Sequence, residues 1–307
     1  MQLSFSSSEL LPTKEDVDFY RENGYYVSPK LFSDEEIDDA IYGSERFYAG
    51  ERDFSLPNSV KRFEGWKPGD GDGARVNDYV SLQNLEISTI ALHPLIGAIA
   101  ARLSGSPAIR LWHDQMIYKP IDHSNKKFGI GWHTDHSYWQ TCTSTEMLTA
   151  WIPFQDCDEE MGPLTVIAGS HQWHGSKSLR GFHSSDLATF EEQCEREGRT
   201  IRKVPLTLKK GQVSFHHCMT VHGSGPNQGS RPRLSLSVHL QDDANRYREV
   251  EDEKGQLVWH RNDVLCRSVD GQPDYTDPDF CPTLWTQQKI DHLPENYRLT
   301  ALSHLFT

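Results

Sequence analysis

A run of short segments between residues 109 and 242 is the feature that most limits the possible folds of this chain. Each segment is bounded by Gly, Pro, Asn or Asp. Segments of this kind, separated by turn residues, are typical of the strands of a barrel or sandwich. They read IRLWHDQMIYKP, GIGWHTDHSYW, MLTAWIPFQD, GPLTVIAGSH, GQVSFHHCMTVHG and RLSLSVHLQ. The sequence therefore predicts a mainly β core over residues 109–245.

The last of these segments alternates apolar and polar residues. Successive side chains of a strand point to opposite faces, so this alternation separates two faces. One face carries Leu234, Leu236, Val238 and Leu240, and the other carries Arg233, Ser235, Ser237 and His239. A sheet with one face in water and a barrel with a polar reaction chamber both predict this pattern.

The residues on either side of the core predict supporting structure. Residues 1–108 carry helical patterns, among them SDEEIDDAIYGSERFYAG, which opens with a Ser33 cap and a Glu three residues later. The intervening WKPGDGDGARVNDYVSL lacks the Lys and Ser/Thr of a phosphate-binding loop, so we expect an ordinary mobile loop. Residues 246–307 are irregular and rich in turns, and we expect them to form a lid or wall of the same single domain.

Charge and composition limit the possible partners. The chain has 31 Lys and Arg against 44 Asp and Glu, a net charge of −13. This balance argues against a nucleic-acid or anionic-membrane surface and favours a small-molecule partner. The six cysteines show no paired spacing, so we expect free thiols. No spanning apolar stretch or leader-like start is evident, and we expect a cytoplasmic protein, with its oligomeric state left open.

GWHTDHSYW places His133 and Asp135 two residues apart in apolar surroundings. Side chains at i and i+2 of a strand project the same way, with Cα atoms roughly 6.5 to 7 Å apart. One metal ion could therefore accept both side chains without bending the backbone. A further nitrogen ligand from another strand would complete the two-histidine, one-carboxylate set that suits ferrous iron.

A second unit follows in HGSGPNQGSRPR, where His222 precedes a turn and Arg233 begins the alternating strand. A buried arginine without an anionic partner would be costly. A ligand carboxylate is the obvious partner, since the guanidinium offers two parallel donors to it.

The stretches GWHTDHSYW, TAWIPFQDCDEEMGPLTVIAGSHQ and KKGQVSFHHCMTVHGSGPNQGSRPRLSLSVHL resemble the phytanoyl-CoA dioxygenase family. The resemblance covers roughly residues 110–242 and implies a double-stranded β-helix, the jelly-roll or cupin-like core, with flanking helices. It implies that His133, Asp135 and His222 bind the metal and act in catalysis. The residues that it implies for cosubstrate binding are Arg233, Ser224, Trp151, Gln115 and Tyr118.

The family resemblance also implies an activity: an Fe(II)- and 2-oxoglutarate-dependent dioxygenase that consumes O2. We expect hydroxylation of an unactivated C–H bond, with release of succinate and CO2. Related halogenases replace the carboxylate ligand with a small residue, whereas Asp135 is present here.

We expect the substrate to be a free small metabolite. The nearest basic clusters for an acyl-CoA are only the pairs Lys126-Lys127 and Lys209-Lys210. The aromatic residues expected around the pocket are Trp112, Trp132, Tyr138, Trp139 and Trp151. Among the other histidines, we expect at most a hydrogen bond to a ligand from His216 or His217, and either structural or cavity-lining roles for His239.

Two alternatives remain open at this point. The same histidines and carboxylate could hold zinc in a cupin-like hydrolase. The barrel could instead be a non-catalytic small-molecule-binding module with structural histidines. Arg233 argues against the hydrolase, because a hydrolase has no general need for a buried anchor of an oxoacid.

Overall fold

The core contains a larger antiparallel sheet of seven strands and a smaller one of four, and a separate pair of strands lies outside them. The computed structural model describes residues 10–57, 65–122, 129–173, 179–184 and 186–287. The strand order of the larger sheet is β1 (Tyr25–Lys30), β8 (Gln212–His217), β5 (Leu148–Pro153), β10 (Arg233–Asp242), β3 (Ala108–Lys119) and β13 (Thr283–Thr286), with β2 (Arg75–Asp78) also paired to β3. The smaller sheet has the order β4 (Ile130–His133), β9 (His222–Ser224), β6 (Thr165–Ile167) and β7 (Lys203–Pro205). The predicted mainly β core is confirmed.

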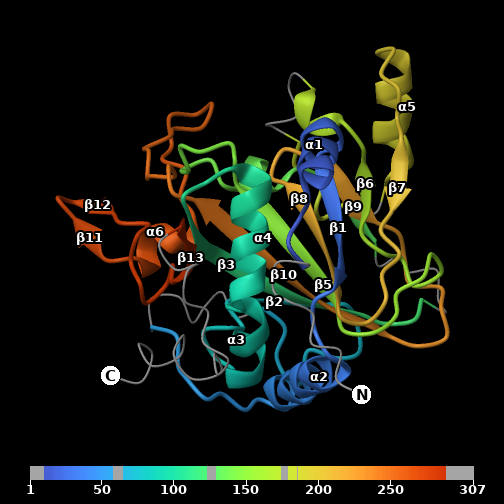
Figure 1. Cartoon of the computed structure of the whole chain (residues 1–307), viewed down its shortest axis with the longest axis horizontal. Coiled ribbons are helices and arrows are strands. Elements are labelled where there is room, and N and C mark those ends of the chain that lie inside the picture. The colour runs from blue at the N-terminus through green and yellow to red at the C-terminus, as the bar shows by residue number, and fades with distance from the viewer. Residues whose placement is uncertain (1–9, 58–64, 123–128, 174–178, 185, 288–307) are drawn as a thin grey trace.

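Helices cover one face of the larger sheet, and α4 runs across β3, β10 and β5 (Figure 1). The N-terminal helices are α1 (Lys14–Asn23), α2 (Asp34–Tyr48), α3 (Leu85–Ala91) and α4 (Pro94–Ser104). Later in the chain come the 3-10 helices η3 (Asp135–Tyr138) and η4 (Ser170–Gln172), the helices α5 (Ala188–Arg196) and α6 (Arg261–Leu265), and the short strands β11 (Ser268–Val269) and β12 (Gln272–Pro273). The predicted Ser33 cap is present: its hydroxyl accepts from the backbone N–H of Glu36, whose carboxylate accepts from the backbone N–H of Ser33.

The stretch Leu85–Ser104 is long and apolar enough to cross a membrane by composition alone. It is broken into α3 and α4, with Pro94 at the first position of α4. Fully buried side chains of both helices, such as Ile87 and Ile99, belong to the main hydrophobic core. These contacts identify them as core helices of the domain.

Three strands of the larger sheet come from outside the expected core. β1 forms one edge of the sheet, where Pro29, which has no backbone N–H to donate, is tolerated because one side of the strand has no neighbour. The predicted mobile loop between residues 66 and 82 contains β2, which pairs with β3, so the loop prediction was wrong there. At the other end of the chain, β13 pairs with β3. The irregular C-terminal segment is thus tied to the core through the main-chain hydrogen bonds of a sheet.

The alternation of β10 divides the core from a cavity, as predicted. Leu236, Val238 and Leu240 are fully buried in the main hydrophobic core. Arg233, Ser237 and His239, on the other face, line the cavity. Of the two structures that the alternation predicts, the structure therefore supports the barrel with a polar chamber over the sheet with one face in water. All six cysteines are free and buried.

Candidate active site

A cavity of about 670 Å³ is lined by residues of both sheets. β3, β5 and β10 of the larger sheet form one wall, and the ends of β4 and β9 form the opposite one. Residues just before and at the start of α6 close a third side. A cavity of this size suits a small organic molecule.

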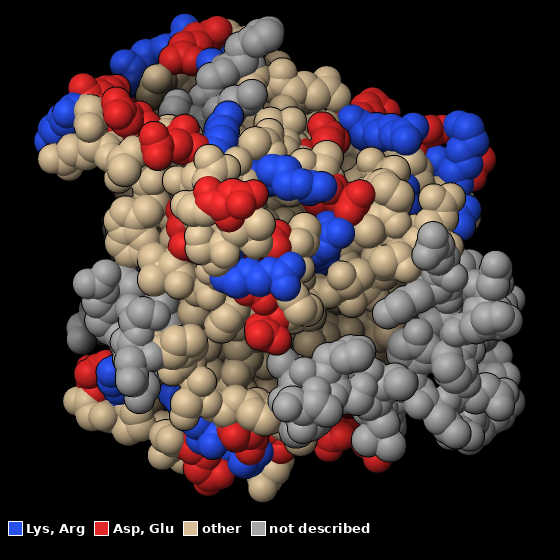
Figure 2. Space-filling model, turned by 90° about the vertical axis from the view of Figure 1, so that its left-hand side faces the viewer, with Lys and Arg blue, Asp and Glu red and all other residues tan. Residues whose placement is uncertain are grey.

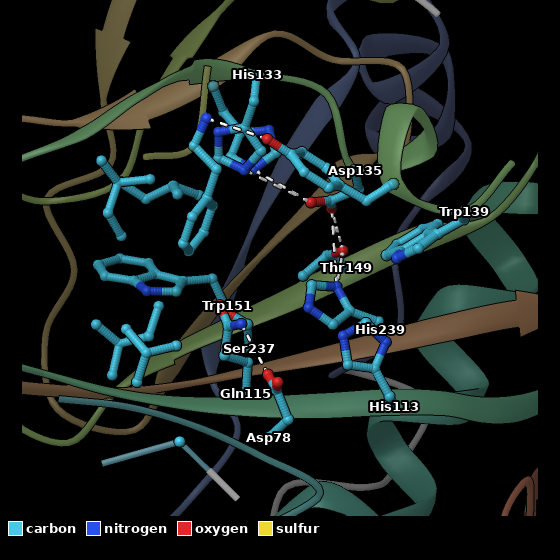
Figure 3. Close-up of a pocket in the computed structure, with 18 of the residues that line it drawn as sticks. Asp78, His113, Gln115, His133, Asp135, Trp139, Thr149, Trp151, Ser237 and His239 are labelled. Atoms are coloured by element: carbon cyan, nitrogen blue, oxygen red, sulfur yellow. Dashed lines mark hydrogen bonds and ion pairs between the residues drawn. The ribbon is translucent and has the colours of Figure 1, made fainter. Parts of the chain in front are cut away.

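His133, Asp135 and His222 come together in this cavity. Figure 3 shows His133 and Asp135 beside each other at one end of it. His133 is the last residue of β4 and lies opposite His222, the first residue of β9. One ligand atom from each of the three residues lies within 4.8 Å of the others. All three side chains are buried. The convergence predicted from two distant segments is present.

The backbone reaches this geometry differently from the prediction. The strand ends at His133, and Asp135 begins the 3-10 helix η3 rather than continuing β4. Thr134 between them is still extended, at φ −117° and ψ 142°. The chain turns because the Ser137 hydroxyl donates to the Thr134 carbonyl at 2.7 Å and the His136 N–H donates to the Cys218 carbonyl at 3.0 Å.

Hydrogen bonds fix which nitrogen of each histidine is available. Nδ1 of His133 lies 2.8 Å from the Gly131 carbonyl, and Nδ1 of His222 lies 2.9 Å from the Thr220 carbonyl. A carbonyl only accepts, so each Nδ1 carries the proton and donates it. Nε2 is then the nitrogen that each histidine can offer to a metal, and both face Asp135, whose Oδ1 is 3.9 Å from His133 Nε2 and 3.4 Å from His222 Nε2.

The second carboxylate oxygen of Asp135 is held by two donors. Oδ2 accepts from the Thr149 hydroxyl at 2.6 Å and lies 3.2 Å from Nε2 of His216. Thr149 also lies 2.7 Å from Nδ1 of His239. These contacts leave Oδ1 as the oxygen that is free to bind a metal.

The electrostatics of the three residues suit a divalent cation. Burial, and after it the neighbouring His222, lowers the pKa of His133 to about 3. Burial alone would raise the pKa of Asp135, but His222 and the hydrogen bond from His216 hold it well below its usual value. Asp135 in turn raises the pKa of His222 against the effect of burial. A cation is therefore favoured between Asp135 and His222, and two imidazoles with one carboxylate form the donor set that suits ferrous iron.

Two buried cations adjoin each other at a second place, and of the two Arg233 lines the cavity. Lys119 and Arg233 face each other across β3 and β10 and are 1% and 2% exposed. Lys119 Nζ donates to the Ser224 hydroxyl at 2.6 Å and to the Gly225 carbonyl at 2.7 Å. Arg233 donates to the Gly162 carbonyl at 2.5 Å, while its Nε has no partner within the described part of the chain.

No acidic side chain among the described residues pairs with either cation. Burial and the neighbouring guanidinium lower the pKa of Lys119 well below its usual value, and burial lowers the pKa of Arg233 to about 10. Two like charges in so buried a place are costly unless an anion joins them. The pair therefore fits a ligand carboxylate, as the sequence predicted for Arg233 alone.

Lys119 was missed at the sequence level, although strand alternation could have found it. Gln115, Ile117 and Lys119 share one face of β3, whereas Tyr118 lies on the other. Tyr118 is not among the residues that line the cavity, and its ring centroid lies 4.5 Å from the guanidinium carbon of Arg75; its role toward a cosubstrate stays a prediction.

The other predicted cosubstrate residues line the cavity. Trp151 places its ring centroid 5.5 Å from the guanidinium carbon of Arg233. Ser224 accepts from Lys119, and Gln115 donates to Asp78 at 2.8 Å. Their roles toward a cosubstrate stay predictions.

The expected aromatic wall is only partly present. Tyr138, Trp139 and Trp151 line the cavity. Trp112 stacks on His260, and Trp132 packs in a separate cluster with Ile167 and Val221, so neither forms the wall.

Several of the remaining histidines line one of two hollows. His216 and His239 line the cavity, as does His183, whereas His171 and His217 line a separate, smaller hollow. The hydrogen bond that His216 makes to Asp135 is the kind predicted. His174 lies outside the described residues.

Comparison with known proteins gives concordant matches. The family model of phytanoyl-CoA dioxygenase (PhyH) matches residues 20–235. A relative named phytanoyl-CoA dioxygenase, peroxisomal, from Bos taurus is 25% identical over 93% of this chain and 84% of its own length. An ectoine dioxygenase from Bordetella bronchiseptica is 25% identical over 72% of this chain and 73% of its own length.

A solved structure extends the likeness to the fold. The epimerase SnoN in complex with Fe3+, alpha ketoglutarate and nogalamycin RO is 25% identical, with a TM-score of 0.65 over 89% of this chain and 98% of SnoN. This likeness confirms the double-stranded β-helix core.

Proposed function

Because this chain belongs to the phytanoyl-CoA dioxygenase family and is an Fe(II)- and 2-oxoglutarate-dependent dioxygenase, we propose that it hydroxylates an unactivated C–H bond of a small-molecule metabolite, releasing succinate and CO2. The observation that carries the proposal is a His–Asp–His cluster in the same cavity as Arg233, whose charge, like that of the adjacent Lys119, no acidic side chain among the described residues neutralises.

Each part of the cavity has a separate task in this proposal. His133, Asp135 and His222 would hold iron through Nε2, Oδ1 and Nε2. Arg233 and Lys119, with the Ser224 hydroxyl, would hold the distal carboxylate of 2-oxoglutarate. Iron and 2-oxoglutarate, when bound, supply the oxidising power from O2. The protein positions the target carbon and excludes water from the enclosed site.

The residue at position 135 favours hydroxylation over halogenation. Asp135 supplies a carboxylate that leaves no room for a chloride ligand in its place, and Thr149 and His216 hold that carboxylate in position. A fully occupied three-residue ligand set is what hydroxylation requires.

A free small molecule fits the surface charges better than a thioester of coenzyme A. Lys209 and Lys210 are paired with Asp156 at 3.0 Å and Asp38 at 2.5 Å. Lys126 and Lys127 lie outside the described residues. Figure 2 shows acidic and basic side chains interspersed over one face of the molecule. Two relatives are associated with small molecules: SnoN was crystallised with nogalamycin RO, and the other is an ectoine dioxygenase.

We also propose that the enzyme acts in the cytoplasm.

Succinate release tests this proposal. The protein, loaded with iron(II) and supplied with 2-oxoglutarate and O2, is assayed with a panel of acyl-CoA thioesters and a panel of free small molecules. We expect free molecules to stimulate succinate release, and the hydroxylated product to appear in equal amount by mass spectrometry. Stimulation by thioesters alone would overturn the substrate class, and a chlorinated product in chloride buffer would overturn the reaction type.

The variant Asp135→Ala provides the negative control. Asp39→Ala is its matched control, because it makes the same substitution at an aspartate outside the cavity. Asp39 is an exposed residue of α2. We expect the first to lose iron-dependent turnover and the second to keep it.

A further inference from the structure

Two of the six cysteines lie in contact beside the C-terminal wall of the cavity. Sγ of Cys266 is 3.8 Å from Sγ of Cys281, and one of the two thiols donates a hydrogen bond to the other. The two residues are 15 positions apart in the chain. The sulfur atoms of three other cysteines instead contact an amide or carbonyl group, and these are Cys142, Cys157 and Cys218.

Hydrogen bonds of the backbone hold the two cysteines in place. Cys266 follows the last residue of α6, and its N–H donates to the Asn262 carbonyl at 2.9 Å. The N–H of Cys281 donates to the Asp277 carbonyl at 2.8 Å. The carboxylate of Asp277 in turn accepts from the N–H of Arg267 at 2.6 Å. Asp277 therefore joins the two segments that carry the cysteines, and a sulfur–sulfur bond needs the two Sγ atoms to approach by only about 1.8 Å.

The two cysteines belong to parts of the molecule with different tasks. Cys281 precedes Pro282, whose carbonyl accepts from the N–H of Leu111 in β3 at 2.9 Å, so it is tied to the larger sheet. Cys266 ends α6, and the residues at the start of this helix line the cavity. Figure 1 shows this part of the chain, from α6 to β13, gathered at one end of the molecule. A bond between the two sulfur atoms would fix a wall of the cavity to the sheet.

Asn262 of α6 joins the pair of thiols to the cavity. Its Nδ2 donates to Sγ of Cys281 at 3.6 Å, and its Oδ1 accepts from the hydroxyl of Tyr79 at 2.6 Å. Tyr79 lines the cavity. A bond formed at Cys281 therefore lies one side chain away from a residue of the cavity wall.

Cys266 is the member of the pair that is nearer to solvent. It is 6% exposed, whereas Cys281 is 0% exposed. The four residues that follow Cys266 are all exposed. The hydrogen bond with Cys281 and, after it, burial raise the pKa of the Cys266 thiol above its usual value. The pair therefore stays in its thiol form at neutral pH until it meets an excess of oxidant.

We propose that Cys266 and Cys281 form a reversible disulfide when the protein is exposed to hydrogen peroxide, and that this bond fixes α6 to the larger sheet. The sulfur of Cys266 attacks one peroxide oxygen, the O–O bond breaks, and a sulfenic acid and one water form. The sulfur of Cys281 then attacks that of Cys266, the S–O bond breaks and a second water leaves. The two thiols lose two electrons to the peroxide, and their two protons end in water. A small thiol reverses the reaction by exchange.

Peptide mapping of the full-length wild-type protein tests the bond. The protein is first freed of iron with a chelator, because iron and peroxide together oxidise side chains without selection. It is treated with hydrogen peroxide at mildly alkaline pH, and the remaining thiols are then alkylated. Trypsin places the two cysteines in different peptides, NDVLCR and SVDGQPDYTDPDFCPTLWTQQK. We expect mass spectrometry to find these peptides joined, and dithiothreitol to separate them.

Two further measurements test whether the bond fixes α6. Closure of a ring of 15 residues should raise the Tm of the oxidised protein by about 5 °C over the reduced protein. The backbone amides of α6 should exchange with deuterium more slowly after oxidation, because the end of the helix is tied down. The amides of α5 should exchange at the same rate in both forms.

Three variants localise these effects. Cys266→Ser and Cys281→Ser each remove one sulfur, so peroxide should change neither their Tm nor the exchange of α6. Cys194→Ser is the matched control, because Cys194 is also buried and lies in another helix, α5. It should respond to peroxide as wild type does. Each variant is compared with its own reduced form, so that a loss of stability from the substitution itself cancels.

Three results would overturn the disulfide: the two wild-type peptides found alkylated and separate after peroxide, either cysteine joined to a different one, or a Tm gain that persists in both Cys266→Ser and Cys281→Ser. Joined peptides with unchanged amide exchange in α6 would overturn the attachment of α6 to the sheet.

Discussion

Single residues in this protein are informative where they break the ordinary rules of burial. Lys119 and Arg233 are buried side by side with carbonyls and a hydroxyl as their partners. Such an arrangement stores an unfavourable free energy that a bound carboxylate would relieve. Asp135 differs, because its charge is already balanced by neighbouring imidazoles and by hydrogen bonds at Oδ2.

Replacing Arg233 by Lys keeps the charge and removes the planar, two-donor geometry. We expect the KM for 2-oxoglutarate to rise by a factor on the order of 10 to 100, which is the cost of about one to two charge-assisted hydrogen bonds. The measurement is succinate release at varied 2-oxoglutarate. Arg102→Lys, on the exposed face of α4, is the matched control and should behave as wild type. An unchanged KM in Arg233→Lys would remove Arg233 from the cosubstrate site.

Replacing Thr149 by Val removes the hydroxyl that donates to Asp135 while keeping the shape of the side chain. We expect iron affinity to fall by about tenfold to a hundredfold, because Oδ2 loses a donor that orients the carboxylate. Competition with a coloured iron(II) chelator measures the affinity. Thr89→Val, at an exposed position of α3, should not change it. If both variants bind iron equally well, Thr149 does not position Asp135.

Residue types and spacing predicted the metal-binding cluster, because His133, Asp135 and His222 are chemically distinctive and fall in recognisable segments. Alternation along β3 places Lys119 on the face of Gln115 and Ile117, but a lysine at a strand end draws no notice until its neighbour across the sheet is known to be Arg233. The contacts of His239 with Thr149 and of His260 with the backbone of Asn262 were also beyond the sequence, because they join segments that are brought together only by the fold or by a helix cap.

At the scale of elements, the site depends on how closely β4 approaches its neighbours. Gly131 lies two residues before His133 in β4. A Cβ atom at this position would lie 2.2 Å from the Gly181 carbonyl oxygen and 2.6 Å from that of Ser184. Both obstacles are backbone atoms, so the strand itself would have to move.

The variant Gly131→Ala should therefore displace His133. We expect a loss of stability of about 1–3 kcal/mol and weaker iron binding, measured by urea unfolding and by chelator competition. Gly73→Ala is the matched control, because a Cβ there would meet nothing within 4 Å. Wild-type values of both quantities in Gly131→Ala would show that β4 tolerates the shift.

Elements with strong periodicity were predictable, and those defined by their partners were not. β10 alternates along its length, and its two faces are as predicted. β1 and β2 are short and contain Pro29 and several polar residues, and they are strands because β8 and β3 pair with them. The end of β4 at His133 likewise depends on contacts of η3 with Cys218 and Leu179.

The folded protein buries several histidines in their neutral form, and its stability therefore depends on pH. Burial is the main reason that the pKa falls to about 3 for His133, to about 4 for His216 and to about 3 for His260. In the unfolded chain these groups titrate near 6.5. Between these values the unfolded state binds more protons, so stability rises with pH.

We expect the free energy of unfolding of the metal-free protein to be fully present above about pH 6.5 and to fall as the pH drops toward 4. Burial raises the pKa of Asp114 to about 6, which offsets one of the protons that the histidines take up on unfolding, so the free energy of unfolding still has a positive slope with pH. Urea titrations from pH 7 to pH 4.5 in the presence of a chelator measure it. The slope should be smaller in His260→Asn, and a stability independent of pH would contradict the neutral state of these histidines.

The central claim is that one iron(II) ion and one 2-oxoglutarate occupy the cavity through His133, Asp135, His222, Arg233 and Lys119. An anaerobic crystal structure of the wild-type protein with both bound tests it most directly. We predict iron within coordinating distance of His133 Nε2, Asp135 Oδ1 and His222 Nε2, with the distal carboxylate of 2-oxoglutarate hydrogen-bonded to Arg233 and Lys119. Iron held by other residues, or that carboxylate placed away from the two cations, would contradict the account.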